Sequence, residues 1–259
     1  MTENKLKSIL GKNYDQTFFN SSTNYSIELE EKGILVFRSF INSKGIKEIV
    51  EEAIKLKPKS HKSSSEYNVY VSPYDSNFSK NSARNRIMKT TKECIPNDLI
   101  SKNSNLFKIY DSNIVQKFFC NILKVKKLYP YSDPLSSINI NYYNNGDSLG
   151  WHFDNSDFTI TLLVKNCSKG GDYEYFNKSR YKNGNENYKE VEEILDGKIK
   201  GQKVESLVGD LMIFKGKESI HRVTEILEDE RILITFNYNV KKGVPLSKQS
   251  RKTFFGRIN

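Results

Sequence analysis

The sequence predicts an α+β protein whose all-β core is a double-stranded jelly roll, with a helical layer in its N-terminal part. Two observations lead to this prediction. Short β-branched runs separated by Gly, Asn and Asp dominate residues 137–240, which is typical of many short strands joined by tight turns. Before that region, apolar residues recur at helical spacing. Helices layered on a double sheet, as in cupin-like folds, bury both kinds of apolar face.

The N-terminal elements follow from local pattern. Residues 1–30 are polar and are expected to form an irregular lead-in, and residues 33–38 form a short β-rich run. Residues 41–54 predict a helix, because apolar positions recur at i, i+3, i+4 and i+7 behind a plausible N-cap at Asn42 or Ser43.

The segment between the first helix and the β-rich region is less regular. The serine-rich residues 61–65 predict a loop, in which His61 would be a solvated histidine. Residues 66–71 could form a strand, and residues 112–123 predict a second helix with one apolar face.

The C-terminal half predicts strands almost throughout. A single helix is expected at 188–195, inside an insertion near 177–200. We expect one domain over 1–259, with a strand and helix layer at 31–136, a jelly-roll metal core at 137–240 and a C-terminal tail at 241–259. The predicted strands are 137–143, 158–165, 173–176, 203–207, 211–214, 220–225 and 231–239.

Composition narrows the class of protein. The chain has 259 residues, 37% of them hydrophobic, so it can bury a core, and it has no apolar run long enough to span a membrane. Its 3 widely spaced cysteines suit a reducing compartment, and we expect a cytoplasmic protein without membrane contact. The net charge of +10 invites a nucleic-acid hypothesis, but the lysines are scattered and nucleic-acid binding is disfavoured.

Two histidines and one carboxylate form the candidate chemical site. His152 and Asp154 stand two residues apart at the end of an apolar run, which places both side chains on one face of an extended chain. His221 lies in a later strand-like run. Two imidazoles and a carboxylate are the ligand set of non-haem Fe(II) oxygenases, although Zn and Mn accept the same donors.

Arg231 is a further candidate site residue, beside the two histidines and the carboxylate. It lies in a predicted β-run, and a buried guanidinium needs an anionic partner, for which a carboxylate has matching geometry. Glu228, Asp229 or Glu230 could supply that carboxylate from within the protein. A carboxylate of a cosubstrate is the alternative.

At this point the sequence resembles the Fe(II)/2-oxoglutarate-dependent dioxygenase superfamily over roughly residues 137–240. The pattern that carries the resemblance is Asn141-x-Tyr143-x-x-Gly146-x-x-Leu149-x-x-His152-x-Asp154. Within the superfamily, the GWHFD run at 150–154 and the GGDYEY run at 170–175 resemble the bacterial lysine halogenases and lysine hydroxylases.

The resemblance implies cofactors and roles. Fe(II), 2-oxoglutarate and O2 would be used to hydroxylate an unactivated C–H bond, with release of succinate and CO2. The metal ligands would be His152, Asp154 and His221, and the distal carboxylate of 2-oxoglutarate would bind Arg231 with support from Asn141 or Tyr143. Halogenases of this branch have Gly or Ala in place of the metal carboxylate, so the presence of Asp154 predicts hydroxylation.

The substrate is expected to be a small molecule, specifically a free basic amino acid such as lysine or arginine. Acidic residues flank the site in sequence and would attract a cation, unless they serve only as turn residues; they are Asp147, Asp157, Asp172 and Glu174. Asn155 departs from this expectation, because a carboxylate there would suit a substrate amine. The candidate substrate contacts are Asn139, Trp151, Asn155 and Asn237.

Three alternatives remain open. A nucleic-acid demethylase of the same superfamily shares the His-x-Asp pattern, but the run 231–237 lacks the Asn and second Arg usual there. A protein hydroxylase commonly has Lys at the position of Arg231. A non-catalytic cupin-type binding module would not need an intact ligand set. The sequence leaves the oligomeric state undetermined.

Overall fold

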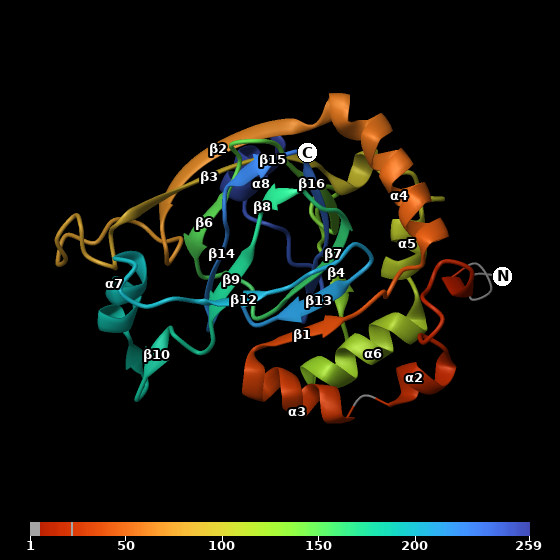
Figure 1. Cartoon of the computed structure of the whole chain (residues 1–259), viewed down its shortest axis with the longest axis horizontal. Helices are drawn as coiled ribbons and strands as arrows, with labels where there is room; N and C mark the ends of the chain where they lie inside the picture. The colour runs from red at the N-terminus through yellow and green to blue at the C-terminus, as the bar shows by residue number, and fades with distance from the viewer. Residues whose placement is uncertain (1–5, 22) are drawn as a thin grey trace.

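The computed structural model describes residues 6–21 and 23–259, and two facing antiparallel sheets form its centre (Figure 1). The helices are α2 (Gln16–Asn20), α3 (Thr23–Lys32), α4 (Ser43–Leu56), α5 (Asn105–Tyr110), α6 (Asn113–Leu123), α7 (Tyr188–Leu195) and α8 (Lys248–Phe255). Within the described residues, none of these helices is long and apolar enough to cross a bilayer.

The larger sheet has seven strands in the order β1-β13-β7-β16-β5-β3-β2, and a smaller sheet has the order β12-β9-β14-β6. The strands of the larger sheet are β1 (Ile34–Phe37), β2 (His61–Asn68), β3 (Ile87–Ile95), β5 (Ile138–Tyr143), β7 (Thr159–Lys165), β13 (Leu211–Phe214) and β16 (Arg231–Phe236). Those of the smaller sheet are β6 (Leu149–His152), β9 (Tyr173–Phe176), β12 (Gln202–Val204) and β14 (Ile220–Val223). Short pairs join β4 (Tyr129–Pro130) to β17 (Tyr238–Asn239), β8 (Lys169–Gly170) to β15 (Ile226–Glu228), and β10 (Tyr181–Lys182) to β11 (Asn185–Glu186).

Alternation along the strands gives the larger sheet two chemically different faces. On β5, Ile138, Ile140 and Tyr142 belong to the main apolar core, which also takes in the buried residues of α4, α5 and α6. Asn139 and Asn141 point to the opposite face, which lies toward the smaller sheet. Helices α2 to α6 gather on one side of the double sheet, whereas α7 stands at the far side (Figure 1). The interior between the sheets is therefore lined with polar side chains, and the jelly-roll prediction is confirmed.

Most of the predicted elements are confirmed, and two predictions are wrong. Residues 1–30 are not an irregular lead-in where they are described, because α2 and α3 bury Phe19 and Leu29 against α6. Residues 61–65 are not a loop but the start of β2, which pairs with β3 over its whole length. Both strands carry polar residues on both faces, so neither has the apolar alternation that marks a strand in sequence. The prediction that core strands begin near residue 137 thus missed β1, β2 and β3 as members of the larger sheet.

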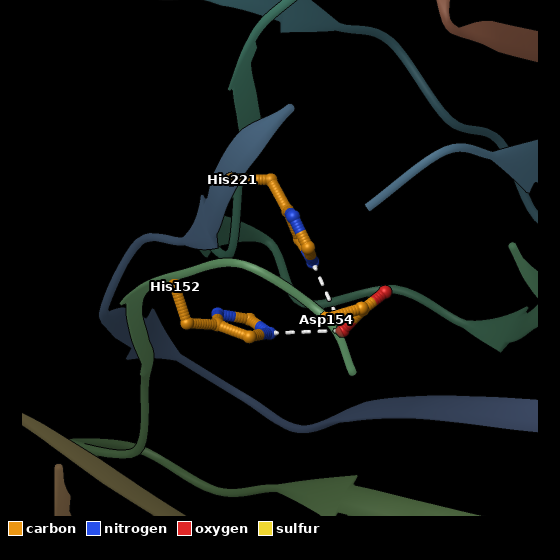
Figure 2. Close-up of side chains that lie close together, drawn as sticks. All are labelled: His152, Asp154 and His221. Atoms are coloured by element: carbon orange, nitrogen blue, oxygen red, sulfur yellow. Dashed lines mark ion pairs between the residues drawn. The ribbon is translucent and has the colours of Figure 1, made fainter. Parts of the chain in front are cut away.

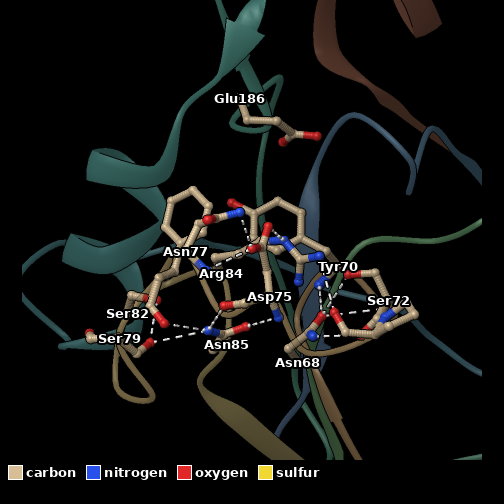
Figure 3. Close-up of polar contacts among 12 residues, drawn as sticks. Asn68, Tyr70, Ser72, Asp75, Asn77, Ser79, Ser82, Arg84, Asn85 and Glu186 are labelled. Carbon is tan, nitrogen blue, oxygen red and sulfur yellow. Dashed lines mark hydrogen bonds and ion pairs between the residues drawn. The ribbon is translucent and has the colours of Figure 1, made fainter.

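The loop between β2 and β3 is held in place by its own side chains (Figure 3). Asn68 Oδ1 accepts hydrogen bonds from the backbone N–H groups of Tyr70 and Ser72, and Asn85 Nδ2 donates to the carbonyls of Asp75 and Phe78. Buried amide side chains that satisfy several backbone groups make such a loop a fixed part of the fold.

Phe118 lies at the centre of the helical layer and offers a test of it. Its fully buried ring packs against Phe18, Phe19, Tyr25 and Phe37. Phe118→Ala is expected to lower the free energy of unfolding by about 3–5 kcal/mol, because it removes apolar contacts and leaves a cavity.

Chemical denaturation would measure the change. Ile54→Ala on α4 is the control, since Ile54 is 57% exposed, and it should change the unfolding free energy by less than about 1 kcal/mol. Equal effects of the two substitutions would contradict this account of the core.

Candidate functional site

Two neighbouring strands of the smaller sheet bring the candidate ligands together. His152 at the end of β6 pairs in register with His221 on β14, and Asp154 follows His152 by two residues just beyond the strand. Both imidazoles point at the carboxylate in Figure 2. Asp154 Oδ1 lies 3.4 Å from His152 Nε2 and 3.7 Å from His221 Nε2. One ligand atom from each residue falls within 4.8 Å of the others, a spacing that could hold a metal ion.

Backbone carbonyls determine which nitrogen of each histidine carries the proton. His152 Nδ1 lies 2.8 Å from the Gly150 carbonyl, and His221 Nδ1 lies 3.0 Å from the Ser219 carbonyl. A carbonyl oxygen only accepts, so each Nδ1 must donate, and in the neutral ring each Nε2 presents a lone pair. Two lone pairs and a carboxylate oxygen then converge on one point. These three electron-rich atoms repel one another unless a cation is bound between them.

The pKa shifts agree with this protonation state. Burial is the largest influence on His221, and together with repulsion from a protonated His152 it lowers the pKa of His221 to about 4, so His221 is neutral near neutral pH. Burial alone would raise the pKa of Asp154, but the two histidines and a hydrogen bond from Thr159 outweigh it and hold that pKa well below its usual range. Near neutral pH the site therefore presents an ionised carboxylate beside a neutral His221.

Gly216 leaves space for the carboxylate. Its carbonyl accepts a hydrogen bond of 3.0 Å from the backbone N–H of Asp154. A Cβ atom on Gly216 would lie 2.1 Å from Asp154 Oδ2 and 2.8 Å from His221 Cε1. Any larger residue would therefore displace two of the three candidate ligands.

Arg231 is a buried cation whose donors are incompletely used. It is 3% exposed, and its Nε and Nη1 have no hydrogen-bond partner within the part of the chain that the structure describes. Burial lowers the pKa of its guanidinium. The suggested internal partner Glu230 instead pairs with Lys57 and Lys165, which leaves the guanidinium free for an anion from outside the chain.

Arg231 and the predicted cosubstrate residues share one end of the interior. Arg231 pairs across the sheet with Tyr143, and its guanidinium lies 6.0 Å from the Tyr143 ring centre. Asn141 lies one inward position farther along β5, where its Nδ2 donates to the Leu233 carbonyl at 3.3 Å. Its Oδ1 accepts a hydrogen bond of 2.8 Å from Lys92 on β3.

The four predicted substrate residues lie in different environments. Asn237 donates to Asn139 at 3.0 Å, and both side chains also donate to backbone carbonyls, so they hold the strand ends together. Trp151 packs between Arg222 and Phe176, in an apolar cluster separate from the histidines. Asn155 is exposed in the turn after Asp154.

The acidic residues near the site are mostly neutralised by partners distant in sequence. Asp157 pairs with Lys217, Asp172 with Lys203 and Glu174 with Arg222. Asp147 accepts hydrogen bonds from Asn144 within a turn. The expectation that these residues attract a cationic substrate is therefore not supported by their surroundings.

Two residues near the site were missed by sequence reasoning. The ring centre of Tyr67 lies 6.1 Å from that of His152, and burial raises the pKa of its hydroxyl. Lys92 extends into the interior from β3. Both belong to strands whose polar sequences gave no strand signal, so their inward orientation could not be predicted.

Gly216→Ala tests the fit of the metal site. It is expected to weaken Ni(II) binding about tenfold or more, because the added methyl group displaces the Asp154 carboxylate and the His221 ring from the positions in which both can bind one metal ion. Calorimetric titration of the metal-free protein measures the affinity. The half-exposed neighbour Lys217→Ala is the control and should bind Ni(II) as the wild type does; equal affinity of both variants would contradict the geometry.

Comparisons with known proteins agree with this site. The sequence matches the family model described as Halogenase D (HalD) over residues 20–254. No curated protein matches the sequence.

Several solved structures share the fold at low sequence identity. HygX from Streptomyces hygroscopicus, solved with nickel and 2-oxoglutarate bound, is 11% identical with a TM-score of 0.57, over 91% of this chain and 96% of that one. A 2OG-Fe(II) oxygenase from Burkholderia pseudomallei is 11% identical with a TM-score of 0.53, over 91% and 95%. A prolyl-4-hydroxylase from Pseudomonas putida is 12% identical with a TM-score of 0.51, over 82% and 95%. The chain belongs to the Halogenase D family, within the Fe(II)- and 2-oxoglutarate-dependent oxygenases.

Proposed function

We propose that this enzyme hydroxylates an unactivated C–H bond of a free amino acid, with conversion of 2-oxoglutarate and O2 to succinate and CO2. The observation that carries the proposal is the convergence of a carboxylate oxygen and two unprotonated imidazole nitrogens at one point of a buried site. Fe(II) suits this donor set, and when bound it supplies the oxidation chemistry.

The protein residues would bind and orient the reactants. His152, Asp154 and His221 would hold the metal, and the backbone carbonyls behind the two rings would keep them in register. Arg231 would take the distal carboxylate of 2-oxoglutarate, because its buried donors lack partners and a carboxylate accepts two parallel hydrogen bonds from a guanidinium. Tyr143, whose ring lies beside that guanidinium, would close the same end of the pocket.

Asp154 favours hydroxylation although the matching family is named for a halogenase. A halide needs a metal position that the protein leaves open. In this chain Asp154 offers a carboxylate for that position; Thr159 donates to its Oδ2 at 2.7 Å, and the Gly216 carbonyl accepts from its backbone N–H. The residues around Asp154 thus support its role as a permanent ligand.

A free amino acid remains the proposed substrate class. It was suggested by the resemblance to lysine halogenases and hydroxylases, and the Halogenase D match supports that branch. The preference for a basic side chain has weaker support, because the nearby acidic residues are paired. Neutral and acidic amino acids therefore belong in the test beside lysine and arginine.

The proposed reaction can be tested by its products. Iron-loaded enzyme, 2-oxoglutarate and oxygen are incubated with each free amino acid, with and without chloride, and succinate is measured. We expect one amino acid to stimulate succinate formation severalfold and to gain the mass of one oxygen atom. A chlorinated product would contradict hydroxylation, and stimulation only by peptides or methylated oligonucleotides would contradict the substrate class.

Arg231→Met tests cosubstrate binding separately. It should weaken 2-oxoglutarate binding to the Ni(II)-loaded protein about 30-fold or more, since truncation of one partner of a buried charge pair costs at least about 2 kcal/mol. Arg231→Lys should bind 2-oxoglutarate with intermediate affinity, because lysine keeps the positive charge but lacks the two parallel N–H donors of the guanidinium. Lys165→Met, at a half-exposed site beside the same strand, is the control. Unchanged affinity in Arg231→Met would contradict the assignment.

A further inference from the structure

Lys92 is a second cation in the interior, and it has no acidic partner. Its Nζ donates to Asn141 Oδ1 at 2.8 Å and lies 5.1 Å from the centre of the Phe254 ring on α8. Among residues 6–21 and 23–259, no carboxylate forms an ion pair with it. An ammonium group has three donors, and Asn141 accepts only one of them.

Three other cations around the larger sheet are neutralised by carboxylates. Lys57 and Lys165 share Glu230, and Arg38 pairs with the buried Asp210. Lys92 instead has a neutral amide and an aromatic face as neighbours, and both favour a cation without neutralising it. A ligand with negative charge would complete this environment.

The position of Lys92 relates it to the metal site. Thr90 and Lys92 are successive inward residues of β3, about 7 Å apart along the strand. Thr90 Oγ1 accepts a hydrogen bond of 3.0 Å from the backbone N–H of Gly150, whose carbonyl orients His152. Thr90 also bonds to the hydroxyl of Tyr67, which lies beside the His152 ring. Lys92 therefore stands one inward position from Thr90, which bonds to β6, the strand that ends at His152.

The two interior cations extend from the two strands that flank β5. Arg231 lies at the Tyr143 end, where the distal carboxylate of 2-oxoglutarate would bind, and the keto-acid end of that molecule would face the metal. Lys92 lies on β3, on the opposite side of β5 from Arg231 in the strand order, and contacts Asn141 and the Phe254 ring of the C-terminal helix. A dicarboxylate that pairs only with Arg231 and the metal would leave Lys92 without a counter-charge.

Building on the proposed function, we propose that Lys92 binds the carboxylate of the amino-acid substrate. Asn141 holds the ammonium group in place, and Phe254 shields it from water. The substrate is thereby recognised at its carboxyl end, and its side chain is left to extend toward the metal. This assignment gives the enzyme a means to prefer amino acids over the corresponding amines.

The first experiment measures binding, independently of turnover. Protein loaded with Ni(II) and 2-oxoglutarate is titrated by calorimetry with lysine and norleucine, and with their decarboxylated counterparts cadaverine and pentylamine. The wild type should bind the better amino acid about 10- to 100-fold more tightly than its amine, as expected for one charge-assisted contact. Lys92→Met should abolish that difference, and Lys92→Arg should retain most of it.

The control variant is Lys89→Met, since Lys89 is exposed on the same strand. It should bind every probe as the wild type does. The assignment is overturned if neither amino acid binds the wild type, if amines bind equally well, or if Lys92→Met retains the preference. It is also overturned if Lys92→Met weakens 2-oxoglutarate itself, because the carboxylate recognised would then be that of the cosubstrate.

A second experiment measures turnover, and it distinguishes a failure of the role proposed for Lys92 from a failure of the proposed hydroxylation. The same variants are assayed for succinate and hydroxylated product. If amino acids bind through Lys92 but no product forms, the proposed function fails while the role of Lys92 stands. If product forms equally in wild type and Lys92→Met at low substrate concentration, the proposed function stands and the role of Lys92 fails.

Discussion

The smaller sheet brings together three atoms that repel one another: Nε2 of His152, Nε2 of His221 and a carboxylate oxygen of Asp154. Contacts from several parts of the structure keep them in place. The cross-strand pair of His152 and His221 aligns the two rings, and the carbonyls of Gly150 and Ser219 set their tautomers. The strand alone would not position Asp154, which lies beyond its end. Thr159 from the larger sheet donates to that carboxylate, and the Gly216 carbonyl fixes the backbone of Asp154, so both sheets are needed to complete one site.

The interior as a whole carries unbalanced charge. Acceptors converge at the metal position, while Arg231 and Lys92 extend inward without carboxylate partners among the described residues. The buried Arg231 costs stability in the ligand-free protein, because a buried charge without a partner is poorly solvated. The apolar core on the opposite face of the larger sheet, rich in Phe and Ile, offsets that cost. In the larger sheet, the face that packs on the helices therefore stabilises the fold, and the face toward the smaller sheet carries the candidate ligand-binding residues.

The sequence was sufficient where a local pattern reflects the three-dimensional environment. His152 and Asp154 stand at the end of a strand-like run, and β5, β7, β13 and β16 are apolar enough to be predicted near their observed bounds. The sequence was insufficient for β2 and β3, because strands with polar residues on both faces resemble loops. Lys92 and Tyr67 were missed for that reason. The ion pairs of Asp157, Asp172 and Glu174 were also unpredictable, since their partners come from distant segments.

The order of strands in the larger sheet has a consequence for how the chain folds. β16, close to the end of the sequence, is a central strand that pairs with both β7 and β5, and β1 near the start pairs with β13. The sheet therefore cannot close until β16 has been synthesised. Pairings between such distant segments lose much chain entropy before they gain contacts, which slows folding. Until then one edge of β5 and one edge of β7 stay unpaired, and unpaired edges of apolar strands promote aggregation.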